Sequence, residues 1–204
     1  MRKKTALVII DPQNCFMDLV RSLVLLSVPG ARQNMKLLAA FICRYIEYID
    51  KIFVSLDTHV ADHISHPERW VDRNGNHPAP FTIITHEEYE RGDWRAADVK
   101  NWYWQGEYLK RLKRPHCIWP VHGQKPTWEW QVYELLAREL AKHPEKVVYV
   151  EKGMHRDTEQ FGLFGADVPF PSAVETEINQ KLIDKLNEFD RVIFAGEASS
   201  HCVM

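Results

Sequence analysis

The chain has 204 residues, 45% of them hydrophobic. This size suits one globular domain whose core buries roughly 70% of the unfolded surface. Its 26 basic and 28 acidic residues leave a formal net charge of −2, which gives no broad attraction for phosphate backbones or anionic lipid. We therefore expect no nucleic-acid or membrane partner and favour a small-molecule ligand.

The N-terminal MRKKTALVII begins like a signal peptide, but its apolar segment ends at Asp11 and is too short for one. No later stretch approaches the roughly 20 apolar residues of a membrane span. The four cysteines lack CxxC spacing, which is typical of reduced thiols rather than of a disulfide framework or a zinc–thiolate site. We expect a cytoplasmic protein.

Four short apolar runs predict strands, and each is uninterrupted rather than alternating, as in a parallel sheet covered on both faces. In chain order they are TALVII before Asp11, KIFVSL before Asp57, KVVYVE before Lys152 and RVIFAG before the turn to Cys202.

Helical periodicities lie between these runs. Apolar residues recur at spacings of three and four over residues 35–49 and again over residues 178–189. Ser172 and Glu175 match a capping box for the later helix. A further helix is expected from Thr127 to about His143, with Thr127 as its N-cap.

Strands that alternate with helices predict an α/β fold: a doubly wound, mainly parallel sheet with helices on both faces, a Rossmann-like three-layer arrangement. We expect a single domain over residues 1–204. The stretch from His59 to Pro126 is too long for a simple crossover. Its Trp, Tyr, Pro and His content predicts an insertion that carries part of a site.

Each strand run delivers a reactive side chain at or just past its carboxyl end, where ligands bind in open α/β sheets. Singly, Asp11 fits a turn, Lys152 a surface cation and Cys202 a buried small residue. Together they predict a nucleophilic site: Asp11 takes the thiol proton, and the charge of Lys152 favours both anions.

Asp57 and His59 are spaced i, i+2, so on an extended segment they project to the same side and can share one metal. Downstream histidines that could complete the site are His63, His66, His77, His116 and His122. Carboxylate and imidazole suit zinc, iron or manganese, and we expect one divalent ion, with zinc preferred. Exposed histidines on a wet loop are the competing interpretation.

Five segments appear in a fixed order: VIIDPQNCFMD, SLDTHVADHISHP, IWPVHG, VEKG and AGEASSHCV. In this order the chain resembles the nicotinamidase and isochorismatase-like superfamily of cysteine hydrolases, from about residue 5 to its last residue. GEASSHCV and the DTH segment are most similar to the nicotinamidase-like branch. The resemblance implies a triad of Asp11, Lys152 and Cys202.

The resemblance also implies metal ligation by Asp57, His59 and His122, with His63 as a candidate fourth ligand. His122 lies in WPVHG, where the family usually has Trp-Pro-x-His-Cys, so Gly123 departs from the pattern without touching the ligand. We interpret His116 and Cys117 as packing of a turn.

Phe16 and Trp119 match aromatic residues that sandwich the substrate ring. Glu197 and Ala198 match the position of a non-proline cis peptide in the family. The oxyanion would then be held by the backbone N–H groups of Ala198 and Cys202.

The reaction implied by the resemblance is hydrolysis of nicotinamide to nicotinate and ammonia through a thioester, within NAD salvage and pyridine nucleotide biosynthesis. A nucleophilic Cys202 argues against the isochorismatase branch. A cysteine amidase for another small amide, of the ureido or maleamic acid type, and a non-catalytic ligand- or metal-binding homologue remain alternatives. A homo-oligomer is a family-level expectation.

Only two residues follow Cys202, whereas family members continue for another helix and further strands. We therefore expect the chain to be truncated at its C-terminus, or to be a short isoform, with an uncovered sheet edge and weak activity.

Overall fold

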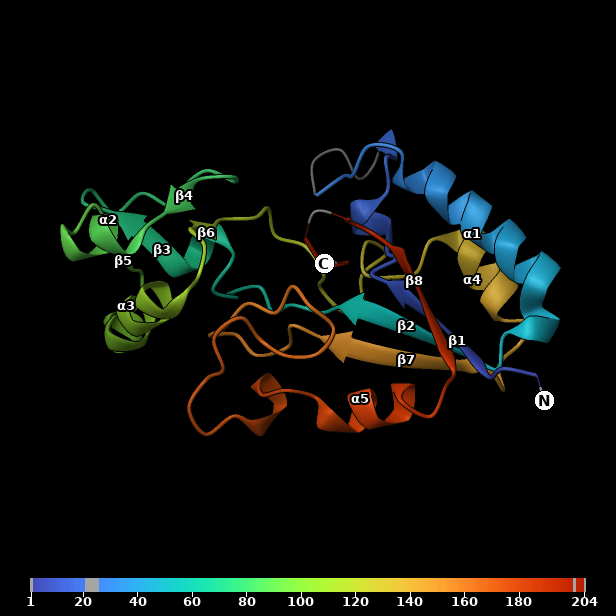
Figure 1. Cartoon of the computed structure of the whole chain (residues 1–204). Coiled ribbons are helices and arrows are strands. Elements are labelled where there is room, and N and C mark those ends of the chain that lie inside the picture. The colour runs from blue at the N-terminus through green and yellow to red at the C-terminus, as the bar shows by residue number, and fades with distance from the viewer. Residues whose placement is uncertain (1, 21–25, 200, 204) are drawn as a thin grey trace.

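The central sheet explains where the predicted reactive residues meet. The computed structural model describes residues 2–20, 26–199 and 201–203. Its main sheet is parallel, in the order β7-β2-β1-β8 (Figure 1). The strands are β1 Thr5–Ile10, β2 Lys51–Asp57, β7 Val147–Lys152 and β8 Arg191–Gly196. The four strands predicted from apolar runs are confirmed.

Successive residues of β1 face opposite layers. Leu7 and Ile9 pack in one cluster with α1 (Ala31–Tyr45) and α4 (Glu134–Leu140). Ala6 and Val8 pack in another with α5 (Gln180–Leu186) on the other face. Figure 1 shows the same division, with α1 and α4 on one side of the sheet and α5 on the other. The predicted doubly wound, three-layer α/β fold is confirmed.

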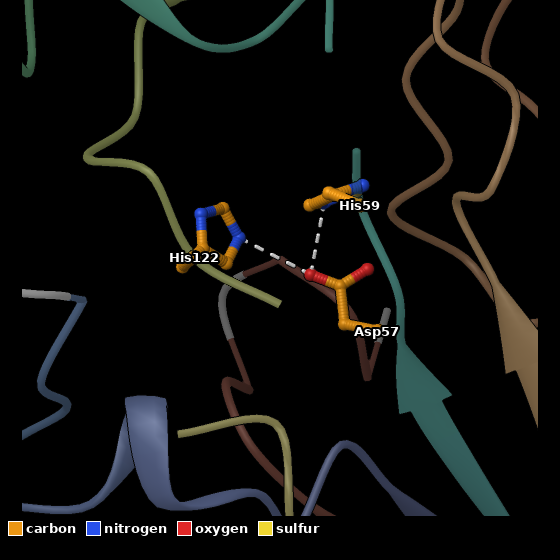
Figure 2. A group of neighbouring side chains, drawn as sticks. All are labelled: Asp57, His59 and His122. Atoms are coloured by element: carbon orange, nitrogen blue, oxygen red, sulfur yellow. Dashed lines mark hydrogen bonds and ion pairs between the residues drawn. The ribbon is translucent and has the colours of Figure 1, made fainter. Parts of the chain in front are cut away.

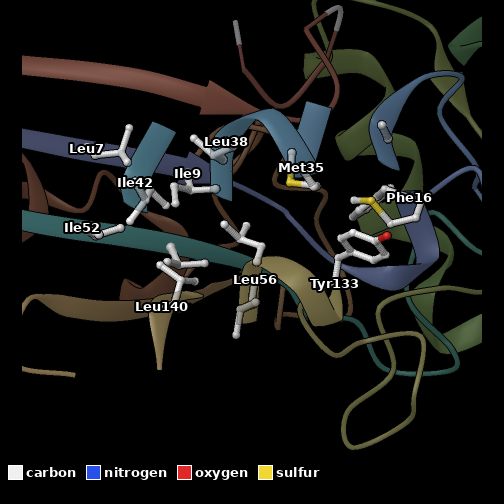
Figure 3. Packing of buried hydrophobic residues seen from close by; sticks show 14 of the residues in the cluster. Leu7, Ile9, Phe16, Met35, Leu38, Ile42, Ile52, Leu56, Tyr133 and Leu140 are labelled. Carbon is white, nitrogen blue, oxygen red and sulfur yellow. The ribbon is translucent and has the colours of Figure 1, made fainter. Parts of the chain in front are cut away.

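Helix α1 is amphipathic, as its spacing predicted. Met35, Leu38 and Ile42 come from successive turns and are buried against the sheet, where they meet Ile52 and Leu140 (Figure 3). Burial of one such side chain contributes about 1.5–3 kcal/mol, so this stripe holds the helix in place. Gly30, with φ of 85°, begins the helix in a conformation that favours glycine.

Residues 60–121 form a small lobe beside the main sheet (Figure 1). It contains β3 Trp70–Asp72, β4 Ile83–Ile84, α2 His86–Glu90, β5 Trp94–Ala96, α3 Trp102–Arg111 and β6 His116–Cys117. Strand β3 pairs with β5 and β4 with β6, both antiparallel. Ile64, Trp70, Tyr108 and Ile118 belong to a separate buried cluster. These lobe residues, joined by Val168, therefore form a core separate from those beside the main sheet.

Short 3-10 turns complete the described elements. They are Asn14–Phe16, Ile46–Tyr48, Pro67–Arg69, Val99–Asn101 and Val174–Thr176. No helix in the described ranges has the length and apolar content needed to cross a bilayer.

The helix predicted from Thr127 to His143 is wrong at its start, because α4 begins only at Glu134. The preceding residues pair with the segment after β1: the Tyr133 amide donates to Pro12 O at 2.8 Å, and Val132 forms a bridge with Gln13. This tertiary pairing holds residues 132–133 extended, and turns precede them where the local sequence favoured a helix.

The capping box predicted at Ser172 and Glu175 is also wrong. Ser172 has φ of 71°, and a 3-10 turn follows it rather than the helix. Asn179 caps α5 instead, and its side chain accepts a hydrogen bond from the Leu182 amide at 3.1 Å. Asn is among the strongest N-cap residues, so Asn179 is a sequence signal for the observed start of α5.

Candidate active site

The carboxyl edge of the sheet gathers the predicted reactive residues. Asp11 follows β1, while Asp57 and Lys152 end the neighbouring strands β2 and β7 and are partners in register. Gly196 ends β8 opposite Ile10, and a Cβ there would lie 2.2 Å from the Ile10 carbonyl oxygen. Only glycine therefore lets β8 turn toward Cys202 at this point.

Lys152 joins two carboxylates in the buried floor of the site. Its Nζ lies 3.1 Å from Asp11 Oδ2 and 2.9 Å from Asp57 Oδ1, and it donates to Gln160 O at 3.1 Å. Burial lowers the pKa of Lys152, but the charges of Asp11 and Asp57 outweigh it and hold that pKa well above its usual value. The lysine is a fixed positive charge.

The two carboxylates differ in basicity. Burial raises the pKa of Asp11, and Lys152 offsets only part of the rise. Burial also raises the pKa of Asp57, but the charges of His59 and Lys152 bring it well below its usual value. Asp11 is consequently the better proton acceptor of the pair, and Asp57 is suited to remain an anion.

Ser55 orients Asp11 and was missed by the sequence analysis. Its hydroxyl donates to Asp11 Oδ1 at 2.5 Å and accepts from the Asp11 amide at 2.9 Å, and the serine is buried. The available signal was a polar residue inside the apolar run of β2, two positions before Asp57.

Cys202 follows β8 in a turn whose His201 amide donates to Ala198 O at 3.1 Å. The structure has a cis peptide between Glu197 and Ala198, at the position that the resemblance implied. Burial raises the pKa of the Cys202 thiol well above its usual value; Lys152 lowers it, whereas Asp11 adds to the rise. The thiol is thus protonated at neutral pH and needs a base to react.

A pocket of about 190 Å³ opens onto these groups. Cys202, Ala198 and Lys152 line it together with Phe16 and Trp119, the two aromatic residues that the resemblance implied for the substrate ring. Phe161 also lines it, with its ring centre 6.1 Å from that of Trp119. The pocket is therefore flanked by rings and carries the thiol and the cation.

Asp57, His59 and His122 converge on the same pocket from β2 and from the two ends of the small lobe (Figure 2). Asp57 Oδ2 lies 3.1 Å from His59 Nε2 and 3.2 Å from His122 Nε2. The three donor atoms lie within 4.8 Å of one another, and all three side chains are buried. One carboxylate and two imidazoles form a donor set that fits a divalent ion such as zinc.

Backbone carbonyls orient both imidazoles. The His59 Nδ1–H donates to Gly153 O at 2.9 Å, and the His122 Nδ1–H donates to Pro120 O at 2.8 Å. Such outer hydrogen bonds fix the tautomer of the neutral ring, in which Nε2 has the lone pair that a metal binds. Burial lowers the pKa of His59, but Asp57 more than offsets it and raises the pKa to about 9.

His63, the candidate fourth ligand, stacks on His59 with ring centres 4.0 Å apart but does not join the group of three. It forms a second cluster with His59 and Glu159, whose donor atoms also lie within 4.8 Å of one another. Glu159 was missed by the sequence analysis, since a lone acid seven positions after Lys152 matches no strand end. Burial lowers the pKa of His63 well below its usual value and that of His66 to about 3.

His116 packs inside the small lobe, where its Nε2–H donates to Ile64 O at 3.0 Å. Its ring centre lies 5.3 Å from that of Tyr108. These contacts stabilise the lobe, which agrees with the interpretation that His116 packs in a turn.

The chain was compared with protein families and with known proteins. No protein-family model matches the sequence. The nicotinamidase of Saccharomyces cerevisiae is 25% identical over 198 residues, covering 97% of this chain and 76% of that protein.

Solved structures share the fold. The yeast nicotinamidase bound to the inhibitor nicotinaldehyde has a TM-score of 0.67 at 20% identity, covering 98% of this chain and 77% of the other. A nicotinamidase/pyrazinamidase from Acinetobacter baumanii gives 0.64 at 19% identity, covering 98% and 74%. The pyrazinamidase of Pyrococcus horikoshii in complex with zinc gives 0.55 at 21% identity, with the same coverage.

Proposed function

Because the chain resembles the nicotinamidase and isochorismatase-like cysteine hydrolases in both sequence and fold, we propose that it hydrolyses nicotinamide to nicotinate and ammonia. The observation that carries the proposal is one pocket lined by Cys202, Lys152 and the Asp57–His59–His122 group. Asp11, the assigned base, lies directly behind Lys152. Activity on another small amide or a non-catalytic role is not favoured.

The proposed reaction begins with attack of Cys202 Sγ on the carboxamide carbon. Asp11 takes the thiol proton and passes it to the departing nitrogen, so the C–N bond breaks and ammonia leaves. Water then opens the thioester, giving its proton to Asp11 and its hydroxyl to the carbonyl carbon. The acid is released and the thiol is restored.

Fixed groups in the site stabilise the charges that develop during this reaction. We assign the oxyanion to the backbone N–H groups of Ala198 and Cys202, and one such donor is typically worth about 3 kcal/mol of barrier. Lys152 stays charged throughout and offsets the anionic carboxylate or thiolate beside it. The raised pKa of Asp11 suits a group that must both accept and return a proton.

We assign metal binding to Asp57, His59 and His122. A divalent ion held there, with zinc preferred over iron or manganese, would supply a Lewis acid for the ring nitrogen of the substrate. Phe16 and Trp119 are assigned to hold the ring by stacking. The His122 ring lies 5.8 Å from Phe16, edge to face, so the metal group and the aromatic wall adjoin.

We further propose that the enzyme acts in the cytoplasm, in NAD salvage. All four cysteines are free thiols in the structure, which suits a reducing compartment.

An ammonia-release assay with nicotinamide tests the proposal. We expect turnover by the wild type and loss of turnover by Cys202→Ala, while nicotinamide binding persists because the aromatic residues are unchanged. Maleamic and ureido amides are assayed in parallel. Preference for one of them would replace nicotinamide as the substrate, and binding without turnover of any amide would identify a non-catalytic homologue.

A further inference from the structure

Four imidazole rings lie together where the small lobe leaves and rejoins the sheet, and two of them, His59 and His122, line the pocket. The His66 ring centre lies 5.6 Å from that of His59 and 5.4 Å from that of His122, with steep interplanar angles of 86° and 67°. His63 instead stacks on His59 at 4.0 Å. His66 is fully buried and adjoins both proposed metal-binding histidines.

The hydrogen bonds of these rings divide them into two kinds. In His59, His122 and His66, Nδ1 faces a backbone carbonyl oxygen; for His66 this is Ala61 O, at 3.0 Å. A carbonyl can only accept, so Nδ1 carries the proton and Nε2 of the neutral ring keeps its lone pair. In His63 it is Nε2 that donates to a carbonyl, Thr158 O, at 3.0 Å.

His63 has therefore used both nitrogens. Its Nδ1 accepts from the Ser65 hydroxyl at 2.7 Å, and no lone pair remains for another partner. His66 differs, because within the described residues no hydrogen-bond partner reaches its buried Nε2. An unsatisfied buried acceptor is destabilising, so such an atom calls for a ligand.

The separation between His66 and the three proposed metal ligands indicates which kind of ligand its Nε2 can bind. Asp57, His59 and His122 have donor atoms within 4.8 Å of one another, but His66 does not join them in such a group. Two nitrogens on the same zinc ion are at most about 4.2 Å apart, given a Zn–N distance of about 2.1 Å. His66 therefore does not fit on the same ion as the other three, and its ring centre, 5.6 and 5.4 Å from those of His59 and His122, lies in the next layer around them. A water molecule bound to the ion is the ligand that can bridge the two layers.

We propose that His66 is a positioning residue of the metal centre: its Nε2 accepts a hydrogen bond from a water molecule in the coordination shell of the ion. The inference rests on the metal-binding part of the proposed function. Outer partners of this kind raise metal affinity by about 10- to 100-fold, because they orient the ligands around the ion.

Zinc affinity of the metal-free protein, measured by competition with a chromophoric chelator, tests the proposal. His66→Phe fills the same space without an acceptor, and we expect it to bind one zinc ion per chain about 10- to 100-fold more weakly than the wild type. His116→Phe is the matched control, since it removes another buried lobe histidine away from the ion, and it should retain wild-type affinity.

Nitrogen-15 NMR of the wild-type histidines gives an answer that needs no variant. Zinc should move the His66 Nε2 resonance in the direction of an acceptor that gains a hydrogen bond, and leave that of His116 in place. A fixed His66 resonance, or affinity within twofold of the wild type for His66→Phe, would overturn the inference and leave the proposed function standing. Failure of the wild type to bind zinc would overturn the metal site and this inference together.

Discussion

Asp57 and Lys152 are register partners on neighbouring strands, and their side chains form an ion pair of 2.9 Å. The other oxygen of the same carboxylate faces the two histidines at 3.1 and 3.2 Å. One aspartate therefore links the proposed catalytic lysine to the proposed metal site. A change at the lysine should therefore affect the metal site, and a change at the metal site should affect the lysine.

Asp57→Asn should disturb both sites at once. We expect loss of stoichiometric zinc binding, a lower kcat, and a fall of about 3–5 kcal/mol in the free energy of unfolding, because a buried ion pair loses one partner. Chelator competition and urea unfolding provide the measurements. Asp93→Asn, which breaks only exposed pairs with Arg73 and Arg91, should change stability by about 1 kcal/mol or less. Equal effects of the two substitutions would contradict the link.

Asp11→Asn should distinguish two effects of Asp11: its role as the base, and the effect of its negative charge on the pKa of the Cys202 thiol. Ammonia release should be lost because no base remains. Alkylation of Cys202 by iodoacetamide at neutral pH should become faster, since the negative charge of Asp11 raises the thiol pKa in the wild type. Slower alkylation would show that Asp11 promotes the resting thiolate instead.

Ser55→Ala should change the pH profile more than substrate binding. The Ser55 hydroxyl lowers the pKa of Asp11, so its removal raises that pKa further. Because catalysis requires ionised Asp11, activity should be lost at the acid end of the profile, and the acid limb of kcat/KM should move to higher pH. Ser55→Thr keeps the hydroxyl and should restore the wild-type limb. An unmoved limb in Ser55→Ala would remove Ser55 from the positioning of Asp11.

Gly153→Ala should weaken metal binding through His59. A Cβ at Gly153 would lie 2.6 Å from His59 Cε1, so the imidazole must shift. Gly75→Ala is a close control, since Gly75 has φ of 86° against 72° for Gly153 but open space around its Cβ. Both variants should lose some stability from backbone strain, of about 1 kcal/mol or more. Only Gly153→Ala should lose zinc affinity; equal losses in both would mean that strain alone is responsible.

Prediction of the central strands β1 and β2 succeeded because burial on both faces requires a continuous apolar run, as in TALVII before Asp11. The edge strands β7 and β8 are partly exposed but also have apolar runs. Helix boundaries failed where distant segments decide the conformation: residues 131–133 pair with residues 12–14. Within the site, side chains at strand ends were identifiable from position. The roles of Ser55 and His66 were not, because a hydroxyl facing a carboxylate or a nitrogen left unpaired is created only by tertiary packing.

The small lobe leaves the sheet at His59 and rejoins the main body at His122, so the two proposed metal-binding histidines stand at its neck. An ion bound by both histidines would close the lobe into a loop, as a crosslink does. It would thereby reduce the conformational freedom of the unfolded chain. Since the lobe has its own core, its outer surface can change sequence without moving the neck. The outer surface of the small lobe is thereby free to diversify while the reacting groups on the sheet keep their places.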